Sequence, residues 1–328
     1  MINARSQDTR SIHGTAAGRG ADSAFRWIVL LAGVLVLAVL ALMIGSTTYE
    51  SWPVFAKEGL GFFTSSTWRP GSSRTEITGE YGALAFIFGT VVTSLLAIVI
   101  AVPLAVAIAL FLTQVARRRV RTVLTYSVDL LAMIPSVVIG LWAVVFFVPV
   151  VIYPVMQVLE STIGQVIPLF EAPVTVRSIF AAGLVLALMI LPIITAIVRE
   201  VFATTPPDER YAAYGMGATD WEVMRHVIVP RARSGIISAS MLGLGRALGE
   251  TIAVLLVIGG SARIGIGLFQ PGQTIAGQIA SAFAEASPEG IDGLIALGVA
   301  LFAITILINM GARFVIWRLG SVGGDSSL

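Results

Sequence analysis

Six long and nearly uncharged apolar runs constrain this chain more than any other feature of its sequence. A helix of about 20 residues, rising 1.5 Å per residue, reaches about 30 Å, the thickness of the apolar core of a bilayer. Backbone groups cannot stay unpaired in hydrocarbon, and these runs are too long and continuous for the strands of a barrel. The sequence therefore predicts an all-α, polytopic membrane protein with six transmembrane helices. The runs extend over residues 27–48, 83–112, 125–153, 178–202, 236–260 and 294–317.

The composition also places the chain in lipid rather than in water. Hydrophobic residues make up 56% of the chain and charged residues 12%, and the mean hydropathy is +0.91. The isoelectric point near 9.2 reflects sparse basic loops between apolar spans, so we expect membrane lipid as the surroundings and no nucleic-acid partner. Cysteine is absent, which excludes disulfides, thiolate metal sites and thiol nucleophiles.

The distribution of basic residues predicts the orientation of the helices. If the N-terminus is cytoplasmic, fifteen of the 21 lysine and arginine residues lie on the cytoplasmic side and five on the opposite side, with Arg246 left inside a span. Cytoplasmic loops of membrane proteins carry the excess of basic residues. The sequence therefore predicts that both termini are cytoplasmic.

The apolar runs divide the chain into four parts. Residues 1–24, rich in glycine, alanine, serine and arginine, are predicted to be a disordered cytoplasmic tail. Residues 25–82 hold the first transmembrane helix, interpreted as a retained anchor, and an extracytoplasmic loop. Residues 83–318 form the main transmembrane domain with a cytoplasmic loop at 203–235, and residues 319–328 form a second cytoplasmic tail. The prolines expected to kink their spans are Pro103, Pro135 and Pro192.

The cytoplasmic loop 203–235 carries the clearest local signals. Two prolines followed by two acidic residues at 206–209 are typical of a helix start, because rigid residues and negative charge both favour the first turn. The Gly-Ala pair at 217–218 should end or bend this helix. A second helix should begin at residue 219 or 220 and run to Pro230.

Small residues in this loop predict a surface for a partner protein. Short side chains on an exposed helix leave a shallow depression into which side chains of a partner fit, while neighbouring apolar residues supply contact area. The alternative is an ordinary amphipathic loop that packs beneath the bundle. The residues predicted to contact a partner are Ala212, Ala213, Gly217, Ala218 and Pro230.

The fifth apolar run contains a charged motif, GLGRALGET at 243–251. If this helix enters the membrane near Ile236, Arg246 lies about 15 Å deep, near the bilayer midplane. A charged arginine there costs at least about 2.5–3.5 kcal/mol, and Glu250, four residues further on, would share its helix face and partly neutralise it. We interpret Arg246 and Glu250 as part of the translocation path of an anion. The plainer alternative is an ion pair that only fixes helix packing.

Signatures of catalysis are absent from the sequence. No GxxxxGK[ST] phosphate-binding loop and no pattern of a hydrolytic triad occur. A membrane-embedded enzyme would also need a cluster of His, Asp or Glu at one depth, and the spans offer only Arg246 and Glu250. We therefore expect a transport subunit rather than an enzyme, with no catalytic residue, no metal site and no cofactor in this chain.

Three separated motifs resemble those of a known transporter family. The spacing of small residues from Ala212 to Pro230 resembles the EAA loop of permeases in ATP-binding-cassette (ABC) importers, which sits in a cleft of the ATPase subunit, although Tyr211 stands where that loop usually has glutamate. The segment ALGET at 247–251 and the segment IPSVVIGLW at 134–142 are similar to those of PstC-type permeases of bacterial phosphate importers. The resemblance extends over most of the chain, roughly residues 25 to 318.

This resemblance implies the MetI-like fold of type I ABC importer permeases and a location in the bacterial cytoplasmic membrane. It implies that the chain receives inorganic phosphate from an extracytoplasmic binding protein and translocates it by alternating access. The implied partners are a PstA-type permease, with which the chain would form a heterodimer, two PstB-type ATPase subunits that would bind ATP and magnesium, and a PstS-type phosphate-binding protein.

Two other functions stay open at this point. The same kind of transporter could carry another oxyanion, such as sulfate or molybdate. An ion-coupled secondary transporter or channel could also work without an ATPase, but the long loop 203–235 and the absence of clearly paired inverted repeats argue against it.

Overall fold

The structure, a computed structural model, describes residues 16–72 and 77–320. The chain divides into two units, residues 1–49 and residues 50–328. The second unit contains both motifs singled out in the sequence, the loop 203–235 and the charged motif of the fifth apolar run.

The described part of the first unit belongs to helix α1 (Ala16–Glu58). This helix begins upstream of the predicted span, so residues 16–24, predicted to be disordered, are helical. Alanine, the strongest helix former, is frequent in this stretch. The rest of the predicted tail lies outside the described residues. Further along α1, apolar side chains such as Val36 and Leu42 are 67% and 72% exposed, as expected of a helix that faces lipid.

The described part of the chain has five helical segments that are long and apolar enough to cross a membrane, and one bent pair of helices that would make a sixth span. The fold is therefore that of a helical membrane protein, as predicted. The number of six spans depends on the bent pair and stays a prediction. The segments are Asp22–Glu58, Leu84–Val115, Ser136–Gly164, Ile179–Ala203 and Pro288–Gly311, with the bent pair Arg233–Gly249 and Ile252–Ile258.

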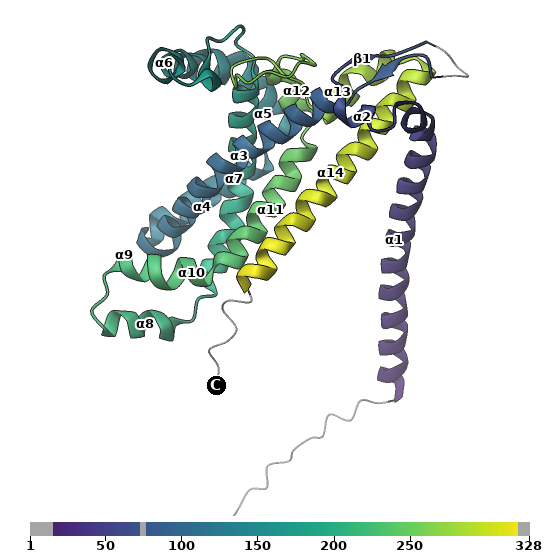
Figure 1. Cartoon of the computed structure of the whole chain (residues 1–328). Coiled ribbons are helices and arrows are strands. Elements are labelled where there is room, and N and C mark those ends of the chain that lie inside the picture. The colour runs from purple at the N-terminus through teal and green to yellow at the C-terminus, as the bar shows by residue number, and fades with distance from the viewer. Residues whose placement is uncertain (1–15, 73–76, 321–328) are drawn as a thin grey trace, which may run out of the picture. The chain divides into compact units, whose positions relative to one another are not determined.

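Helices α3 (Leu84–Leu110) and α7 (Ile179–Ala203) form the centre of the second unit. Helix α11 (Arg233–Gly249) packs on both, and α14 (Pro288–Gly320) packs on α11, so that the four helices run alongside one another (Figure 1). Small side chains let helices approach closely where lipid supplies no hydrophobic force between them. The buried small residues of α3 recur every four positions, at Ala97, Ala101, Ala105 and Ala109.

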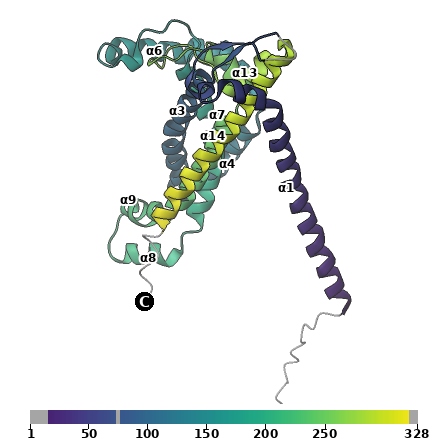
Figure 2. The ribbon, with the colours of Figure 1, turned by 45° about the vertical axis from the view of Figure 1, so that its right-hand side comes forward.

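Short elements gather at two opposite ends of this bundle (Figures 1 and 2). One end carries α8 (Pro207–Gly215) and α9 (Asp220–Val223), which belong to loop 203–235. The other end carries α6 (Tyr153–Leu159) and α13 (Ile275–Ala282). Outside loop 203–235 the π-helical segments are η1 (Phe111–Val115), η2 (Ala143–Ile152) and η3 (Glu160–Gly164), and the 3-10 segments are η4 (Pro168–Phe170) and η6 (Phe283–Glu285), all within the described residues.

The third predicted span is not one helix. Helix α4 (Arg118–Met133) ends two residues before Pro135, and α5 (Ser136–Trp142) begins directly after it. Proline has no N–H to donate, and it disfavours the helical backbone of the residue before it; Ile134 is accordingly extended, with ψ 127°. The predicted kink is therefore a complete break, and the apolar segment that could span starts at Ser136.

The fifth predicted span is also broken. Helix α11 ends at Gly249, Glu250 is extended with ψ 127°, and α12 (Ile252–Ile258) continues at an angle of 66° to α11. Packing explains the bend, because α12 lies against α5. A Cβ atom at Gly140 of α5 would stand 2.7 Å from the Cα atom of Ala253, so the missing side chain permits this approach.

A buried carboxylate joins the start of α14 to a small antiparallel pair of strands, β1 (Trp68–Arg69) and β2 (Glu80–Tyr81). Glu289 is 2% exposed. Its carboxylate accepts hydrogen bonds from the backbone N–H groups of Thr78 (2.7 Å) and Gly79 (2.6 Å) and from the Thr78 hydroxyl (2.9 Å). Helix α2 (Gly61–Thr64) lies beside this pair, and Phe62 and Tyr81 are fully buried in one cluster.

Replacing Glu289 with alanine should open this strand pair. The change leaves two backbone N–H groups without their charged acceptor, and a hydrogen bond to a charged group contributes about 1.5–3 kcal/mol. We expect amide exchange at Thr78 and Gly79, followed by mass spectrometry, to accelerate at least about tenfold. Replacing the exposed Glu285 with alanine is the matched control and should leave this exchange unchanged. Equal exchange in both variants would contradict a structural role for Glu289.

The tyrosine of this strand pair should make its stability depend on alkaline pH. Burial raises the pKa of Tyr81 to about 12, with a further rise from the charge of Glu289, while the Gly71 N–H that donates to its hydroxyl opposes the shift. A phenol ionises near pH 10 in the unfolded chain. The folded state favours the neutral phenol, so its stabilisation is complete below about pH 10 and is lost as the pH rises toward about 12.

This dependence can be measured by following the ultraviolet absorbance of phenolate during an alkaline titration. The chain has six tyrosines, and Tyr81→Phe should remove the one that ionises near pH 12. A wild-type titration that is complete near pH 10 would contradict the burial of this phenol.

Candidate functional site

Loop 203–235 folds into two short helical stretches. The first, α8 (Pro207–Gly215), begins at the predicted proline and has Asp208 and Glu209 in its first turn. The second begins after Thr219 and runs without interruption through three segments. Both predicted helices are therefore confirmed. The three segments are α9 (Asp220–Val223), η5 (Met224–Ile228) and α10 (Val229–Arg231).

The turn between the two stretches depends on Gly217. Its φ of +86° lies in the left-handed region, which side chains other than glycine rarely adopt. A Cβ atom there would meet nothing within 4 Å, so the requirement for glycine comes from the backbone and not from crowding. The Ala218 N–H donates to the Ala213 carbonyl at 3.1 Å and closes the end of α8.

Side chains on both sides of the turn fix the start of the second stretch. The Thr219 hydroxyl accepts from the Glu222 N–H, and the Glu222 carboxylate accepts from the Thr219 N–H at 2.8 Å, which forms a capping box. The hydrogen bonds from Thr219 lower the pKa of the Glu222 carboxyl. The Tyr214 hydroxyl donates to Asp220 at 2.9 Å, and this bond raises the pKa of Tyr214. The turn is thus held in one conformation by polar contacts.

The loop is anchored to the bundle on one side only. Ala213, Val223 and Ile228 are buried, and the Arg210 guanidinium donates to the Gln114 side-chain carbonyl at 2.7 Å, which joins α8 to η1. Exposed apolar side chains cover the other side, namely Tyr211, Met216 and Trp221, which are 70%, 84% and 62% exposed. The loop packs against the bundle, as the alternative interpretation expected, and still leaves an apolar surface without a partner in the described chain.

A hollow of about 780 Å³ opens between the two stretches of the loop. Of the residues predicted to contact a partner, Ala212, Ala213 and Pro230 line it, whereas Gly217 and Ala218 lie at the turn outside it. An ion pair of 2.9 Å between Glu209 and Arg231 connects the stretches across the hollow. Met216 and His226, which were not predicted to contribute, complete its lining together with Val227.

The charged motif of the fifth run does not form the predicted pair. Because α11 ends at Gly249, Glu250 does not continue the helix face that carries Arg246, and the prediction of a shared face is wrong. Among the described residues, no ion pair joins Arg246 to a carboxylate. The Glu250 carboxylate instead accepts from the Ala253 N–H at 3.4 Å, at the start of α12.

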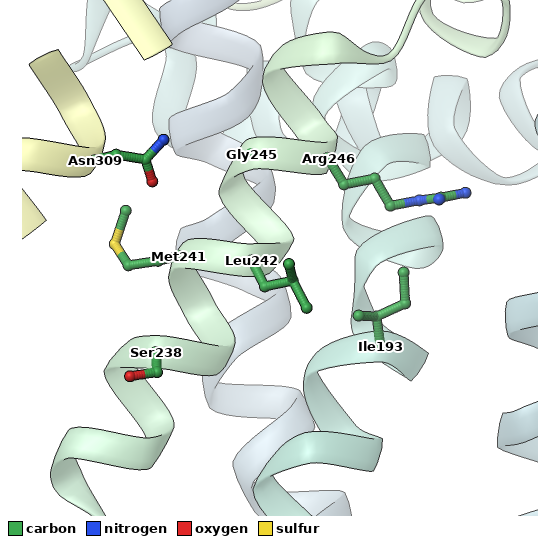
Figure 3. A pocket seen from close by; sticks show the side chains of 7 residues that line it. All are labelled: Ile193, Ser238, Met241, Leu242, Gly245, Arg246 and Asn309. Carbon is green, nitrogen blue, oxygen red and sulfur yellow. The ribbon is translucent and has the colours of Figure 1, made fainter. Parts of the chain in front are cut away.

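Arg246 lines a cavity of about 520 Å³ between three helices. In Figure 3 its side chain extends away from α11 above Ile193 of α7, while Asn309 of α14 lies on the other side of α11. A Cβ atom at Gly245 would meet nothing within 4 Å, so the surroundings of this lining residue are open. The other residues that line the cavity are Ser238, Met241 and Leu242.

Three polar residues of the spans escaped the sequence interpretation. Asn309 and Ser238 line the cavity, and an amide inside an apolar run is a signal that could have identified Asn309. The third is Arg199, whose guanidinium lies 3.6 Å from the Asp129 carboxylate and connects α7 to α4.

The fold and these two sites define a class: a helical membrane protein with an exposed loop of two helical stretches at one end of its bundle. Residues 101–319 match the family model described as binding-protein-dependent transport system inner membrane component. The chain belongs to this family.

Curated relatives share most of the chain. The phosphate transport system permease protein PstC of Mesorhizobium japonicum is 40% identical over 92% of each chain. PstC of Xylella fastidiosa is 39% identical over 93% of each chain, and PstC of Haemophilus influenzae is 38% identical over 92% of this chain and 95% of that protein.

Solved structures share the fold at lower identity. A chain of a bacterial ABC transporter involved in the import of the acidic polysaccharide alginate is 17% identical, with a TM-score of 0.60, and the match covers 92% of this chain and 99% of that chain. A chain of the MetNI methionine ABC transporter in an inward-facing conformation is 19% identical, with a TM-score of 0.50, over 73% of this chain and 94% of that chain. The predicted MetI-like permease fold is confirmed.

Proposed function

We propose that this chain is the permease subunit of an ABC importer that translocates inorganic phosphate. The observation that carries this proposal is the 40% identity to a PstC permease along 92% of both chains. The chain itself is a transport subunit, and ATP hydrolysis belongs to a separate subunit. In this proposal the protein lies in the bacterial cytoplasmic membrane with both termini in the cytoplasm. It pairs with a PstA-type permease, two PstB-type ATPases that bind ATP and magnesium, and a PstS-type binding protein.

The loop 203–235 is proposed to be the contact with the ATPase. Its hollow, lined by Ala212, Ala213 and Pro230, offers little steric resistance to an inserted helix or side chain. The exposed Met216 and Trp221 would add apolar contact area. The last stretch of the loop ends at Arg231, and α11 begins at Arg233, so movement of the loop would be transmitted directly to the helix that carries Arg246.

Arg246 is proposed to contact the phosphate as it passes. A guanidinium offers a planar pair of N–H donors that match the oxygens of a phosphate ion. No carboxylate neutralises Arg246 within the described chain, and its side chain is exposed beside a cavity. A site on a path must release its ion, so weak and transient contact is what transport requires. Glu250, at the break between α11 and α12, would limit the positive charge near this site without forming a direct pair.

Reconstitution of the complete transporter in proteoliposomes tests the proposal. We expect uptake of labelled phosphate that requires the binding protein and internal ATP and that resists a protonophore. Competition by sulfate or molybdate at equal concentration would indicate another oxyanion as the substrate. Uptake that needs an ion gradient and no ATP would instead show a secondary transporter.

A further inference from the structure

The first turn of helix α4 concentrates positive charge that nothing in the described chain neutralises. Arg117, Arg118, Arg119 and Arg121 lie within five residues, and no acidic residue occupies the first turn. The N-terminus of a helix carries partial positive charge, so cations there are unfavourable unless an anion joins them. Within the described residues, none of these guanidinium groups forms an ion pair or a side-chain hydrogen bond.

Two of the four arginines share a hollow with hydroxyl groups. Arg118 and Arg121 lie on one helix face with Thr122 and Thr125, because side chains three, four and seven residues apart align along a helix. The hollow has a volume of about 570 Å³. Paired guanidinium groups are donors that recognise the oxygens of a phosphate group. The Thr125 hydroxyl also lines the hollow, whereas the Thr122 hydroxyl already donates to the Arg118 carbonyl at 2.9 Å. The residues that line the hollow are Ala116, Arg118, Arg121, Thr122, Thr125 and Tyr126.

An exposed apolar stripe continues from this basic turn along α4. Val123, Tyr126, Leu130 and Met133 recur every three or four residues and are 64%, 65%, 63% and 76% exposed. Another side of α4 faces the bundle, where Asp129 forms an ion pair with Arg199 of α7. A helix with a basic end and an apolar stripe is typical of a contact with the membrane interface.

The position of the basic turn also fits the interface. Gln114, three residues before Arg117, accepts the hydrogen bond from Arg210 of α8. The arginines therefore lie at the same end of the bundle as loop 203–235, and the apolar stripe leads away from them along α4. In the proposed orientation this end is the cytoplasmic one, where clustered arginines attract anionic lipids.

We propose that Arg118 and Arg121 bind the phosphate group of an anionic phospholipid whose acyl chains lie along the exposed stripe of α4. Free inorganic phosphate shares the headgroup chemistry but would leave the stripe uncovered, so the lipid accounts for both features. This site is separate from the cavity at Arg246 and does not depend on which ion the transporter carries.

Lipid titration of the purified complete transporter tests the site. The complex is placed in nanodiscs of phosphatidylcholine with increasing phosphatidylglycerol, and retained lipid is counted by native mass spectrometry. A direct hydrogen bond from a guanidinium to a charged phosphate oxygen strengthens binding about tenfold or more. We therefore expect the double variant Arg118→Gln/Arg121→Gln to bind phosphatidylglycerol at least about tenfold more weakly. The matched control, Arg117→Gln/Arg119→Gln, removes the same charge from the same turn but no residue that lines the hollow. It should lose only the general attraction of charge and should therefore bind phosphatidylglycerol clearly more tightly than the Arg118/Arg121 variant.

Three results would overturn the site. Equal losses in both double variants would show diffuse attraction of charge rather than a site. Millimolar inorganic phosphate could displace the lipid from wild type and from the control but have no effect on the Arg118/Arg121 variant. That result would assign the hollow to free phosphate. Full retention of the lipid in that variant, together with weaker co-purification of a partner subunit, would assign the arginines to a protein contact. The thermal stability of both variants, measured in the same nanodiscs, should match that of wild type.

Discussion

Replacing Arg246 with glutamine should lower ATP-dependent phosphate uptake by about 100-fold while the transporter still assembles. Glutamine lacks both the charge and the paired donors of a guanidinium. A hydrogen bond to a charged group contributes about 1.5–3 kcal/mol, and a loss of about 3 kcal/mol corresponds to roughly 100-fold. Arg246 is exposed and has no ion-pair partner in the described chain, so its removal leaves no carboxylate unpaired. The measurement is uptake of labelled phosphate in proteoliposomes, with assembly checked by co-purification.

Two further variants separate the role of Arg246 from general effects of charge. Arg313→Gln makes the same change at an exposed arginine of α14 that does not line the cavity, and uptake should stay within about twofold of wild type. Arg246→Lys keeps the charge but loses the planar pair of donors, so its uptake should fall between those of wild type and the glutamine variant. Full uptake in Arg246→Gln would remove this residue from the path.

The helical membrane fold and the two loop helices could be predicted from the sequence because local signals determine them. An uninterrupted apolar run is long enough to cross lipid whatever its neighbours are, and backbone pairing then requires a helix. In loop 203–235, proline and acidic residues favour the start of a helix and glycine favours its end, and each effect is confined to the adjacent turn. Helix α8 accordingly begins at Pro207, and the turn that follows it contains Gly217 in a left-handed conformation.

The two breaks in the spans could not be predicted because they depend on distant packing. Pro103 and Pro192 remain inside α3 and α7, which are packed along their length, whereas Pro135 separates α4 from α5. The sequence around these prolines does not distinguish a kink from a break. The bend after Gly249 similarly depends on Gly140, more than a hundred residues earlier, which lets α12 approach α5.

The candidate sites also combine residues that local sequence signals identify with residues that only the tertiary fold brings together. The loop residues Ala212, Ala213 and Pro230 were found because small residues and a proline are visible along the chain, and they line one hollow. The pairing of Arg246 with Glu250 was inferred from their spacing of four residues. This spacing places two side chains on the same face only in an unbroken helix. Asn309 comes from another helix and joins the cavity only through the tertiary fold.

Replacing Gly217 with valine should uncouple ATP hydrolysis from transport. At a φ of +86° a β-branched residue is a strong conformational outlier, and such strain costs about 1–3 kcal/mol. The turn would relax by rotating the second stretch of the loop relative to α8, which displaces Pro230 from Ala212 across the hollow. We expect phosphate uptake and the stimulation of hydrolysis by the binding protein to fall at least about tenfold.

The neighbouring Gly215 supplies the matched control for this turn. It is exposed, it ends α8 with an ordinary negative φ, and a Cβ atom there would also meet nothing within 4 Å. Gly215→Val therefore adds the same side chain without the strain, and its uptake and stimulated hydrolysis should stay near those of wild type. Because neither position is crowded, a difference between the two variants can only come from the backbone of the turn. Normal co-purification and normal stimulated hydrolysis in Gly217→Val would show that the loop does not couple the two subunits.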